Sequence, residues 1–410
     1  MKSWKMNKNF DPNLRALAER VHTPAYVFNS DVFRERAAQV KTEFGEKTGL
    51  CFSIKANPFL LKCLPAEFDF IEVCSPGELT ICEQLGIDMG KIILSGVNKT
   101  REDVSRAMDD GVGVFTAESR LHLRLINEAA VERGIKVPLL LRLTAGSQFG
   151  MDRADIIDIV EHRAEYAGVR IVGLHYFSGT QKRKTALIER ELDRVMDFVR
   201  EVRLEHSFEF ERLEYGSGLA VDYFTPDADE TELEHLHEAA QKIRAVSEEI
   251  RLSVEMGRFF AAPCGCYFTR VMDIKTNEGV NYAIVDGGLN QLKYHGQIQG
   301  MQIPEITHIK AAPDACGEKQ SWTLCGSLCT TADVLARNVE LEGLAIGDIL
   351  VFHRTGAYSV TEGMALFLSR ELPEVSLYSA GGGIEKLRDI LQTALFNMPA
   401  AQYLNGEINT

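Results

Sequence analysis

The sequence predicts an α/β fold: a (β/α)8 TIM-like barrel joined to a C-terminal, mostly antiparallel β domain. Between residues 50 and 256, eight short apolar runs alternate with longer segments whose apolar residues recur at helical spacing. After residue 262, strand-like runs follow one another with few helical intervals. Eight strands alternating with helices is the number that closes a parallel barrel. A doubly wound sheet, the alternative, rarely carries so many consecutive units.

The elements follow in chain order. The barrel strands are expected at 50–54, 69–73, 91–95, 112–115, 137–143, 169–176, 210–215 and 252–256, and helix-like stretches lie at 76–86, 100–111, 117–134 and 184–206. Strands of the second domain are expected at 267–275, 282–288, 321–328 and 347–358, followed by an amphipathic helix at 384–397 that three glycines open. We therefore assign residues 25–262 to the barrel. Residues 1–24 and 263–410 are assigned to the β domain with its C-terminal helix.

Composition argues against several classes of partner. Hydrophobic residues make up 45% and charged residues 25%, the balance of a soluble globular protein. The net charge is -14, and no cluster of Lys and Arg stands out in the sequence. This argues against nucleic acid or an anionic membrane as a partner. No secretory signal precedes residue 15, and no apolar run approaches the roughly 20 residues of a membrane span. Nine scattered cysteines without zinc spacing predict a cytoplasmic protein with reduced thiols and no metal site.

Ionisable, glycine and aromatic residues stand at the ends of the predicted strands or directly after them. In a parallel barrel the C-terminal strand ends gather on one face, and chemistry is found there. A ring of such residues at one face therefore predicts the active site. Its members are Lys55, Glu72, Arg142, His175 to Phe177, Glu214 to Gly218, Glu255, Gly257 and Arg258.

Each of these residues also has an ordinary explanation. Lys55 could bind phosphate, act as a base or form an imine, or simply reach water from a strand end. The turn Gly216–Ser217–Gly218 could cradle a phosphate or be a plain tight turn. Glu255 and Arg258 could form a common ion pair. Together, however, they suit pyridoxal 5'-phosphate, which needs an imine-forming lysine, an acid at its pyridine nitrogen and a phosphate pocket.

Seven motifs resemble, in order and spacing, those of the fold-type III pyridoxal phosphate-dependent decarboxylases, the ornithine and diaminopimelate decarboxylases. They run from about residue 25 to about 375 and read "FSIKANP", "SGVNKT", "GLHYFSGTQ", "YGSGLA", "VEMGR", "CGSLCTTADVL" and "GAYS". The resemblance implies a decarboxylase that removes the α-carboxylate of an amino acid. It also implies a head-to-tail homodimer with active sites shared between subunits.

The resemblance implies a role for each matched residue. Lys55 would form the imine with the cofactor, and Glu255 would keep its pyridine nitrogen protonated. Arg142 and Glu72 would support the ring side. Across the dimer, Cys329 of the partner subunit would handle the proton on the substrate carbon. Around the phosphate would lie Thr180, Gly216, Ser217, Gly218, Gly257, Arg258 and Tyr358.

Three departures bear on the substrate. Phe177 stands where the family usually places a histidine on the cofactor ring, and Met256 where it usually has proline. Thr330 stands where diaminopimelate decarboxylases carry the glutamate that binds the distal amino group, and their distal arginine motif is absent. This resembles the branch that acts on amino acids tethered to carrier proteins. Asp333, also from the partner in this family, would face the far end of the substrate.

The sequence thus predicts decarboxylation of an amino acid or a derivative, free or carrier-bound. Diaminopimelate decarboxylase of lysine biosynthesis is the first alternative, and a catalytically inactive regulator that binds pyridoxal phosphate is the second. Retention of Lys55, Glu255 and Cys329 argues against the inactive regulator. Racemases of similar barrel fold usually pair the pyridine nitrogen with arginine, so Glu255 also favours decarboxylation.

Overall fold

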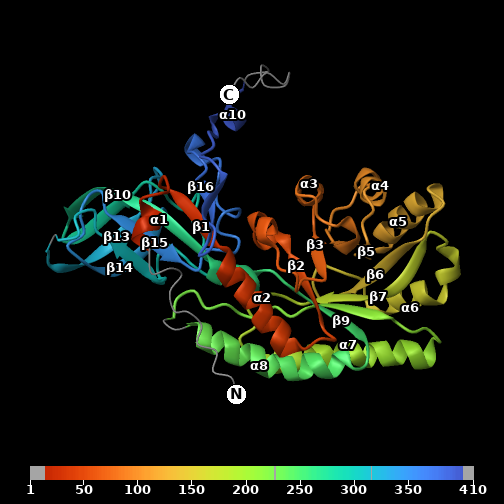
Figure 1. Ribbon diagram of the computed structural model, residues 1–410. Helices are drawn as coiled ribbons and strands as arrows, with labels where there is room; N and C mark the ends of the chain where they lie inside the picture. Colours follow the sequence, from red (N-terminus) through yellow and green to blue (C-terminus); the bar gives the residue numbers. More distant parts are fainter. Residues whose placement is uncertain (1–13, 226–227, 315, 400–410) are drawn as a thin grey trace. The chain divides into compact units, whose positions relative to one another are not determined.

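The computed structural model describes residues 14–225, 228–314 and 316–399. These residues form two compact units (Figure 1). The barrel unit holds residues 34–221 and 229–260, and the β unit holds the described residues of 1–33, 222–228 and 261–410. Residues 1–13 and 400–410, which the sequence assigns to the β domain, lie outside the described residues.

Eight parallel strands close the barrel in sequence order, as predicted (Figure 1). The last strand pairs with the first, so that Glu255 lies level with Cys51. The strands are β2 (Gly49–Ser53), β3 (Phe70–Val73), β4 (Ile92–Leu94), β5 (Val114–Ala117), β6 (Val137–Leu143), β7 (Val169–Phe177), β8 (Arg212–Gly216) and β9 (Arg251–Met256).

Short polar caps begin the helices that follow the strands. Thr100 opens α4 (Arg101–Asp109) with a reciprocal capping box to Asp103, and Ser119 caps α5 (Arg120–Glu132). α7 and α8 run side by side (Figure 1), joined by a 2.9 Å hydrogen bond from Thr185 to Glu238. The remaining helices are α1 (Leu14–Ala18), α2 (Ser30–Phe44), α3 (Pro76–Gln84), α6 (Arg153–Glu161), α7 (Thr185–Glu205), α8 (Ala228–Ser247) and α9 (Arg258–Ala261).

Strand register brings the predicted chemical residues to one end of the barrel. On the β7–β8–β9 side, Phe177 lies level with Gly216, and Gly216 with Glu255. On the β2–β3 side, Ser53 lies level with Glu72. Within the barrel, Cys51, Ile93, Val114, Leu140 and Val172 form one buried apolar cluster.

The β unit is a nine-stranded, mostly antiparallel sheet (Figure 1). Its core includes Val27, Phe268 and Val351. Parallel pairs occur between β1 and β16 and between β11 and β13. The strands are β1 (Ala25–Asn29), β10 (Gly265–Asn277), β11 (Val280–Val285), β12 (Ile306–Ile309), β13 (Lys319–Cys325), β14 (Val334–Glu342), β15 (Ile349–His353), β16 (Glu374–Ser379) and β17 (Gly383–Arg388).

Two expectations about the β domain need correction. Residues 25–33 belong to the β unit and not to the barrel, because β1 pairs with β10 and β16. The expected helix at 384–397 is wrong: β17 pairs antiparallel with β16, and only the short α10 (Ala394–Asn397) is helical there. Gly383, the first residue of β17, adopts a φ of 74° directly after the turn between the two strands. The turn returns Ile384 to the β-unit core, so tertiary pairing overrides the helical pattern.

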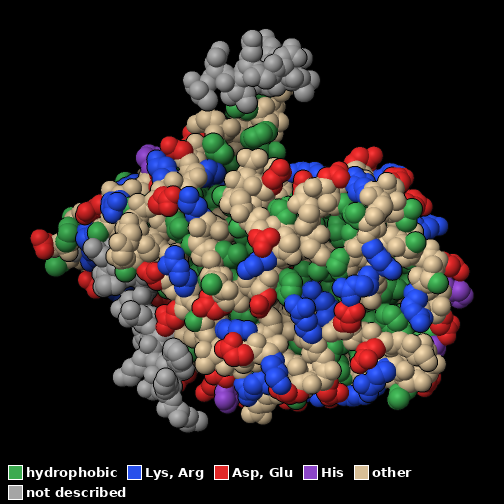
Figure 2. Space-filling view, turned by 45° about the vertical axis from the view of Figure 1, so that its right-hand side comes forward, with side chains coloured by type: hydrophobic (Ala, Val, Ile, Leu, Met, Phe, Trp, Pro, Cys, Tyr) green, Lys and Arg blue, Asp and Glu red, His purple; other side chains and the backbone are tan. Residues whose placement is uncertain are grey.

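No helix among the described residues is long and apolar enough to cross a membrane. Within the same ranges, no group of three His, Cys, Asp or Glu side chains is placed to bind a metal ion. On the face shown in Figure 2, basic side chains lie among acidic ones.

Candidate active site

The candidate active site is built around Lys55, in the short 3₁₀ turn Ile54–Ala56 that follows β2. Its Nζ lies 2.5 Å from Oε2 of Glu72 and 3.7 Å from Oε1 of Glu255. The Lys55 side chain is 38% exposed, whereas the side chains of Glu72 and Glu255 are 4% and 7% exposed. The amine therefore reaches the open end of the barrel, and the two carboxyls beneath it are shielded from water.

The residues after Lys55 explain why the strand stops there. The Asn57 backbone N–H donates to the carbonyl of Ile54 at 2.9 Å, and the Asn57 side chain accepts from the backbone N–H of Phe59. Pro58 occupies the start of the next 3₁₀ segment, Pro58–Cys63, where its missing N–H is not needed. The chain thus turns as soon as β2 ends and holds Lys55 at the barrel mouth.

Cys74 contacts the second carboxyl oxygen of Glu72, the one that does not face Lys55. Its thiol donates to Oε1 of Glu72 at 2.9 Å and lies 3.5 Å from the Lys55 amine. Burial raises the pKa of Cys74 well above its usual range, so the thiol stays protonated as a donor. The Cys74 backbone N–H donates to Glu78 at 2.6 Å, and Ser75 caps α3 by accepting from the Glu78 N–H. Sequence reasoning missed Cys74, although this S-x-x-E pattern directly after β3 was a usable signal.

Glu255 is the deeper of the two carboxyls near Lys55. Its Oε1 accepts from Ser53 Oγ at 3.2 Å, and its Oε2 lies 3.1 Å from Nε2 of His175. Burial raises the pKa of Glu255, but Lys55 and His175 outweigh that effect and hold it below its usual range. The carboxylate therefore stays ionised inside the barrel, as the partner of a protonated pyridine nitrogen must.

A second buried ion pair, between Arg142 and Glu118, crosses from β6 to the end of β5. Glu118 also accepts from the Gly150 backbone N–H at 3.3 Å, and the Arg142 guanidinium lies 5.0 Å from the centre of the Phe149 ring. Arg142 was expected in the site, but its partner Glu118 was not. The acid was hard to find because it stands three residues after the apolar run 112–115 and has no neighbour of obvious function.

Lys99, in the predicted motif "SGVNKT", is buried in the loop after β4. Its ammonium donates to the backbone carbonyls of Ser95 and Gly96. Burial lowers the pKa of Lys99 to about 8, partly offset by Glu118. This lysine therefore closes its own loop.

Two glycine-containing loops meet at the ends of β7 and β8. Gly218 has a φ of 63°, and a Cβ there would lie 2.1 Å from the Gly179 carbonyl oxygen, so only glycine fits. The Lys182 N–H donates to the Gly218 carbonyl at 2.8 Å, which joins the loop of Thr180 to that of Gly218. A Cβ at Gly216 would lie 2.4 Å from the Phe177 ring. Such closely approaching loops are typical of phosphate cradles.

The predicted site residues fall in two units. The barrel unit holds Lys55, Glu72, Arg142, Phe177, Thr180, Gly216, Ser217, Gly218, Glu255, Gly257 and Arg258. Within it, Gly257 passes so close to Lys55's neighbour Ala56 that a Cβ would lie 2.7 Å from the Ala56 Cβ. A lysine amine at the mouth, an ionised buried carboxylate and the joined glycine loops fit pyridoxal phosphate. The β unit holds Cys329, Thr330, Asp333 and Tyr358, whose roles stay predictions.

Asp333 is 2% exposed in the β unit. Its two carboxyl oxygens accept from the backbone N–H groups of Leu289 and Leu328, both at 2.8 Å. Burial raises the pKa of Asp333, and these two hydrogen bonds oppose the rise. Asp333 therefore secures the turn that carries the exposed Cys329 and its neighbour Thr330.

Comparison with known proteins places these features in a family context. The family model "Pyridoxal-dependent decarboxylase, pyridoxal binding domain" matches residues 30–262. A diaminopimelate decarboxylase of Pseudomonas fluorescens is 30% identical over 84% of this chain and 85% of its own. The L-glutamyl-(BtrI acyl-carrier protein) decarboxylase of Niallia circulans is 26% identical over 93% of this chain and 96% of its own. The crystal structure of diaminopimelate decarboxylase from M. jannaschii, 24% identical and covering 94% of each chain, shares the fold with a TM-score of 0.80.

Proposed function

We propose a substrate class, an assembly and residue roles for this chain, which belongs to the pyridoxal-dependent decarboxylases and is a pyridoxal phosphate-dependent amino-acid decarboxylase. The observation that carries the roles is the Lys55 amine beside two buried carboxyls, Glu72 and Glu255. When bound, pyridoxal phosphate supplies an electron sink for the charge that develops as CO2 departs.

Each of the barrel residues has a separate role in this proposal. Lys55 would carry the cofactor, and Glu72, 2.5 Å from Nζ, would take up and return a proton at that nitrogen. Glu255 would face the ring nitrogen and, because it stays ionised, would favour a proton there. The joined loops of Thr180 and Gly218 would hold the phosphate through backbone N–H groups.

Borohydride reduction tests the role of Lys55. The reduced protein should carry the cofactor on Lys55 when its peptides are analysed by mass spectrometry. Lys99, which is also buried but holds its own loop, is the natural competitor. A cofactor found on Lys99, or on any other lysine, would contradict the assignment.

For the substrate, we infer an amino acid whose far end is neutral or extended, including one carried on a protein. The support is Thr330, a neutral residue where a carboxylate would be needed to bind a distal ammonium. Burying an ammonium without a partner carboxylate costs several kcal/mol. The Niallia circulans relative, named for a carrier-bound glutamyl substrate, aligns over nearly the whole of both chains. The second candidate is diaminopimelate decarboxylation, which the 30% identity to the Pseudomonas fluorescens enzyme favours.

Release of CO2 separates the two candidates. A panel of free amino acids is tested first, then aminoacyl groups on an acyl-carrier protein. Free meso-diaminopimelate should be a poor substrate compared with a carrier-bound or amide-linked amino acid. A kcat/KM for free meso-diaminopimelate of about 10^4 M⁻¹s⁻¹ or more would contradict the inference from Thr330.

We also propose that the chain forms a cytoplasmic homodimer. All nine cysteines are free, which suits a reducing compartment. Residues 364–368 and 391–398 of the β unit expose several large apolar side chains, and the Asn397 side chain ties the two segments by donating to the Leu366 carbonyl at 2.8 Å. Such a surface is typical of an interface, and a second copy of the chain is the proposed occupant. The exposed residues are Met364, Leu366, Phe367, Leu368, Leu391, Phe396 and Met398.

Subunit mixing tests both the dimer and a shared site. Lys55→Ala and Cys329→Ala chains should each be inactive, and their heterodimers should recover part of the activity, because one of the two sites regains both residues. Light scattering verifies the dimer, and mass labels verify subunit exchange. Full exchange without recovery would show that Lys55 and Cys329 act within one subunit or not together.

A further inference from the structure

Besides the Arg142–Glu118 pair, the barrel buries the charged residues Arg212 and Glu214, which have no role in the function proposed above. Glu214 lies level with Ser253, two residues before Glu255 on β9. Its side chain is 0% exposed, and its Oε2 accepts from Arg212 at 3.0 Å. Arg212 also donates to Ser253 Oγ at 3.1 Å and stacks on the Phe70 ring. Arg212 therefore donates a hydrogen bond to one carboxyl oxygen of Glu214, Oε2, and none to the other, Oε1.

The second carboxyl oxygen of Glu214 and a ring nitrogen of His175 are both buried without a hydrogen-bond partner in the described part of the chain. Oε1 of Glu214 is buried without a hydrogen-bond partner of normal length among the described residues. His175, on β7, is the register partner of Glu214, and its Nδ1 is likewise buried without such a partner. A ring nitrogen and a carboxyl oxygen are complementary, and buried polar atoms are nearly always satisfied. We infer that these two atoms, on register-paired residues, are linked directly or through one water, with the Cys51 thiol as the other donor near Glu214.

The other ring nitrogen of His175 links this pair to the candidate active site. Nε2 lies 3.1 Å from Oε2 of Glu255. His175 thus neighbours two carboxyls: Glu255, which lies nearer the mouth, and Glu214, its own register partner. A carboxyl behind a histidine decides which ring nitrogen carries the proton and how strongly the charged ring is favoured.

We propose that Glu214 is a positioning residue that acts through His175 on Glu255, and so sets the charge that Glu255 presents to the cofactor ring. The proposal rests on the role of Glu255 proposed above. Ionised Glu214 holds the His175 ring so that its Nε2 faces Oε2 of Glu255, and this contact supports the negative charge on Glu255. Protonated Glu214 withdraws that support.

The groups around Glu214 bring its pKa close to neutral pH, where enzymes work. Burial raises the pKa of Glu214 to about 7, with Arg212 opposing the rise and Glu255 adding to it. His175 and the thiol of Cys51, on β2, also lower it. The charge of Glu214 therefore changes near neutral pH and not near the usual range of a glutamate.

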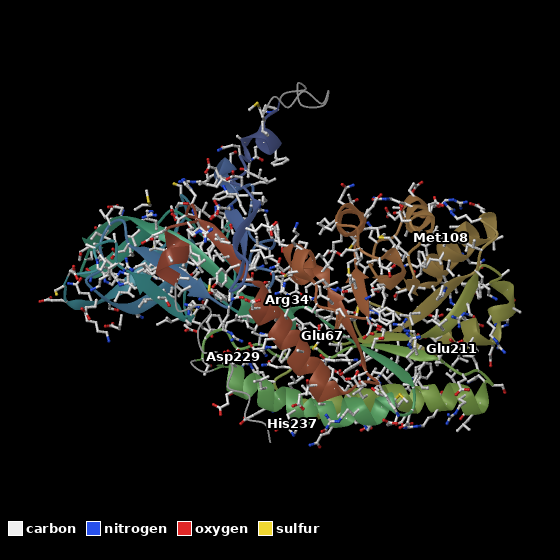
Figure 3. The ribbon with its side chains drawn as sticks, viewed as in Figure 1. Arg34, Glu67, Met108, Glu211, Asp229 and His237 are labelled. Atoms are coloured by element: carbon white, nitrogen blue, oxygen red, sulfur yellow. The ribbon has the colours of Figure 1, made fainter. Side chains whose placement is uncertain are left out.

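The absorbance of the bound cofactor tests the proposal without turnover. The holoenzyme is titrated from about pH 5.5 to about pH 8.5 in four forms: wild type, Glu214→Gln, Glu214→Asp and Glu211→Gln. Glu211 is the matched control, because it lies just before β8 (Figure 3) and forms a 2.6 Å ion pair with the exposed Arg170.

The wild type should show an inflection near pH 7, which Glu214→Gln loses. Glu214→Asp keeps a displaced inflection, and Glu211→Gln matches the wild type. Above the inflection, Glu214→Gln should also bind pyridoxal phosphate about tenfold more weakly, the equivalent of one pKa unit, and at low pH equally well. A Glu214→Gln profile that superimposes on the wild type overturns the proposal.

Two further outcomes are decisive. Should Glu214→Gln fail to fold, His175→Gln removes the middle group and should lose the same inflection; retention of the inflection overturns the proposal. A wild-type protein that binds no pyridoxal phosphate contradicts the proposed function itself. A wild type that binds the cofactor on Lys55 but is indifferent to Glu214 contradicts this inference alone.

Discussion

Glu255 and Glu214 are two carboxyls buried in the same barrel, on neighbouring strands and one level apart. Burial raises the pKa of both, yet that of Glu255 ends below its usual range and that of Glu214 at about 7. The difference lies in their partners: Glu255 has the Lys55 amine in addition to His175, whereas Arg212 and His175 together compensate the burial of Glu214 only in part. Burial raises the pKa of a carboxyl, and nearby cations decide whether the carboxyl nevertheless remains an anion.

Removing Lys55 should have the largest effect. Lys55→Ala should abolish turnover, by about 10^4-fold or more, because the proposed attachment point of the cofactor is lost. The same change removes the cation beside Glu255, so the pKa of Glu255 should rise toward that of Glu214. CO2 release and infrared titration of the carboxyls measure the two effects. Lys47→Ala, which removes a surface ion pair to Glu248, is the control and should retain activity.

Neutralising Glu255 comes next. Glu255→Gln should lower kcat/KM by about 10^2- to 10^4-fold, since a neutral amide does not hold a proton on the ring nitrogen. Glu255→Asp retains the charge at a shorter reach and should lose less. Steady-state kinetics on the best substrate compare the two. Equal losses in both variants would show that shape at this position, not charge, is what matters.

Glu214 should make the protein less stable as pH rises. Its pKa is raised above the value of about 4.5 in the unfolded chain, so the native state holds the proton more tightly. The resulting stability is full below about pH 4.5 and lost as pH rises to about 7, a change of about 3 kcal/mol. Urea unfolding at several pH values measures it. In Glu214→Gln this part of the pH dependence should disappear, and a slope identical to wild type would argue against it.

The smallest effect is expected at Cys74, which orients Glu72, the second acid at Lys55. Cys74→Ala removes a hydrogen bond to a charged group, worth about 1.5–3 kcal/mol, so pyridoxal phosphate should bind about tenfold or more weakly. Cys74→Ser keeps a donor and should restore most of the affinity. Fluorescence titration with the cofactor measures both variants. Weak binding by the serine variant as well would mean that packing of the sulfur, not its proton, is needed.

The ring of chemical residues could be found from the sequence because its members stand at the end of an apolar run or directly after it. Lys55 and Glu255 are such cases, and the strand register brings their side chains to within 3.7 Å. Cys74 was missed because a cysteine does not mark a cofactor site by itself, and Glu118 because it lies beyond the end of its apolar run. Glu214 and His175 stood in the predicted ring, but nothing in their spacing indicated that they would be register partners, each with a buried polar atom that lacks a hydrogen-bond partner among the described residues.

The sequence by itself determined the eight barrel strands and the lysine at the end of the first, since apolar runs and the turn at Asn57 and Pro58 are local features. It did not determine the strand β17, whose residues carry a helical pattern, because pairing with β16 outweighs local propensity. Nor did it determine the opposite pKa directions of Glu255 and Glu214. Those depend on which cations the closed barrel brings near each carboxyl, and electrostatic interactions follow distance in space, not separation along the chain.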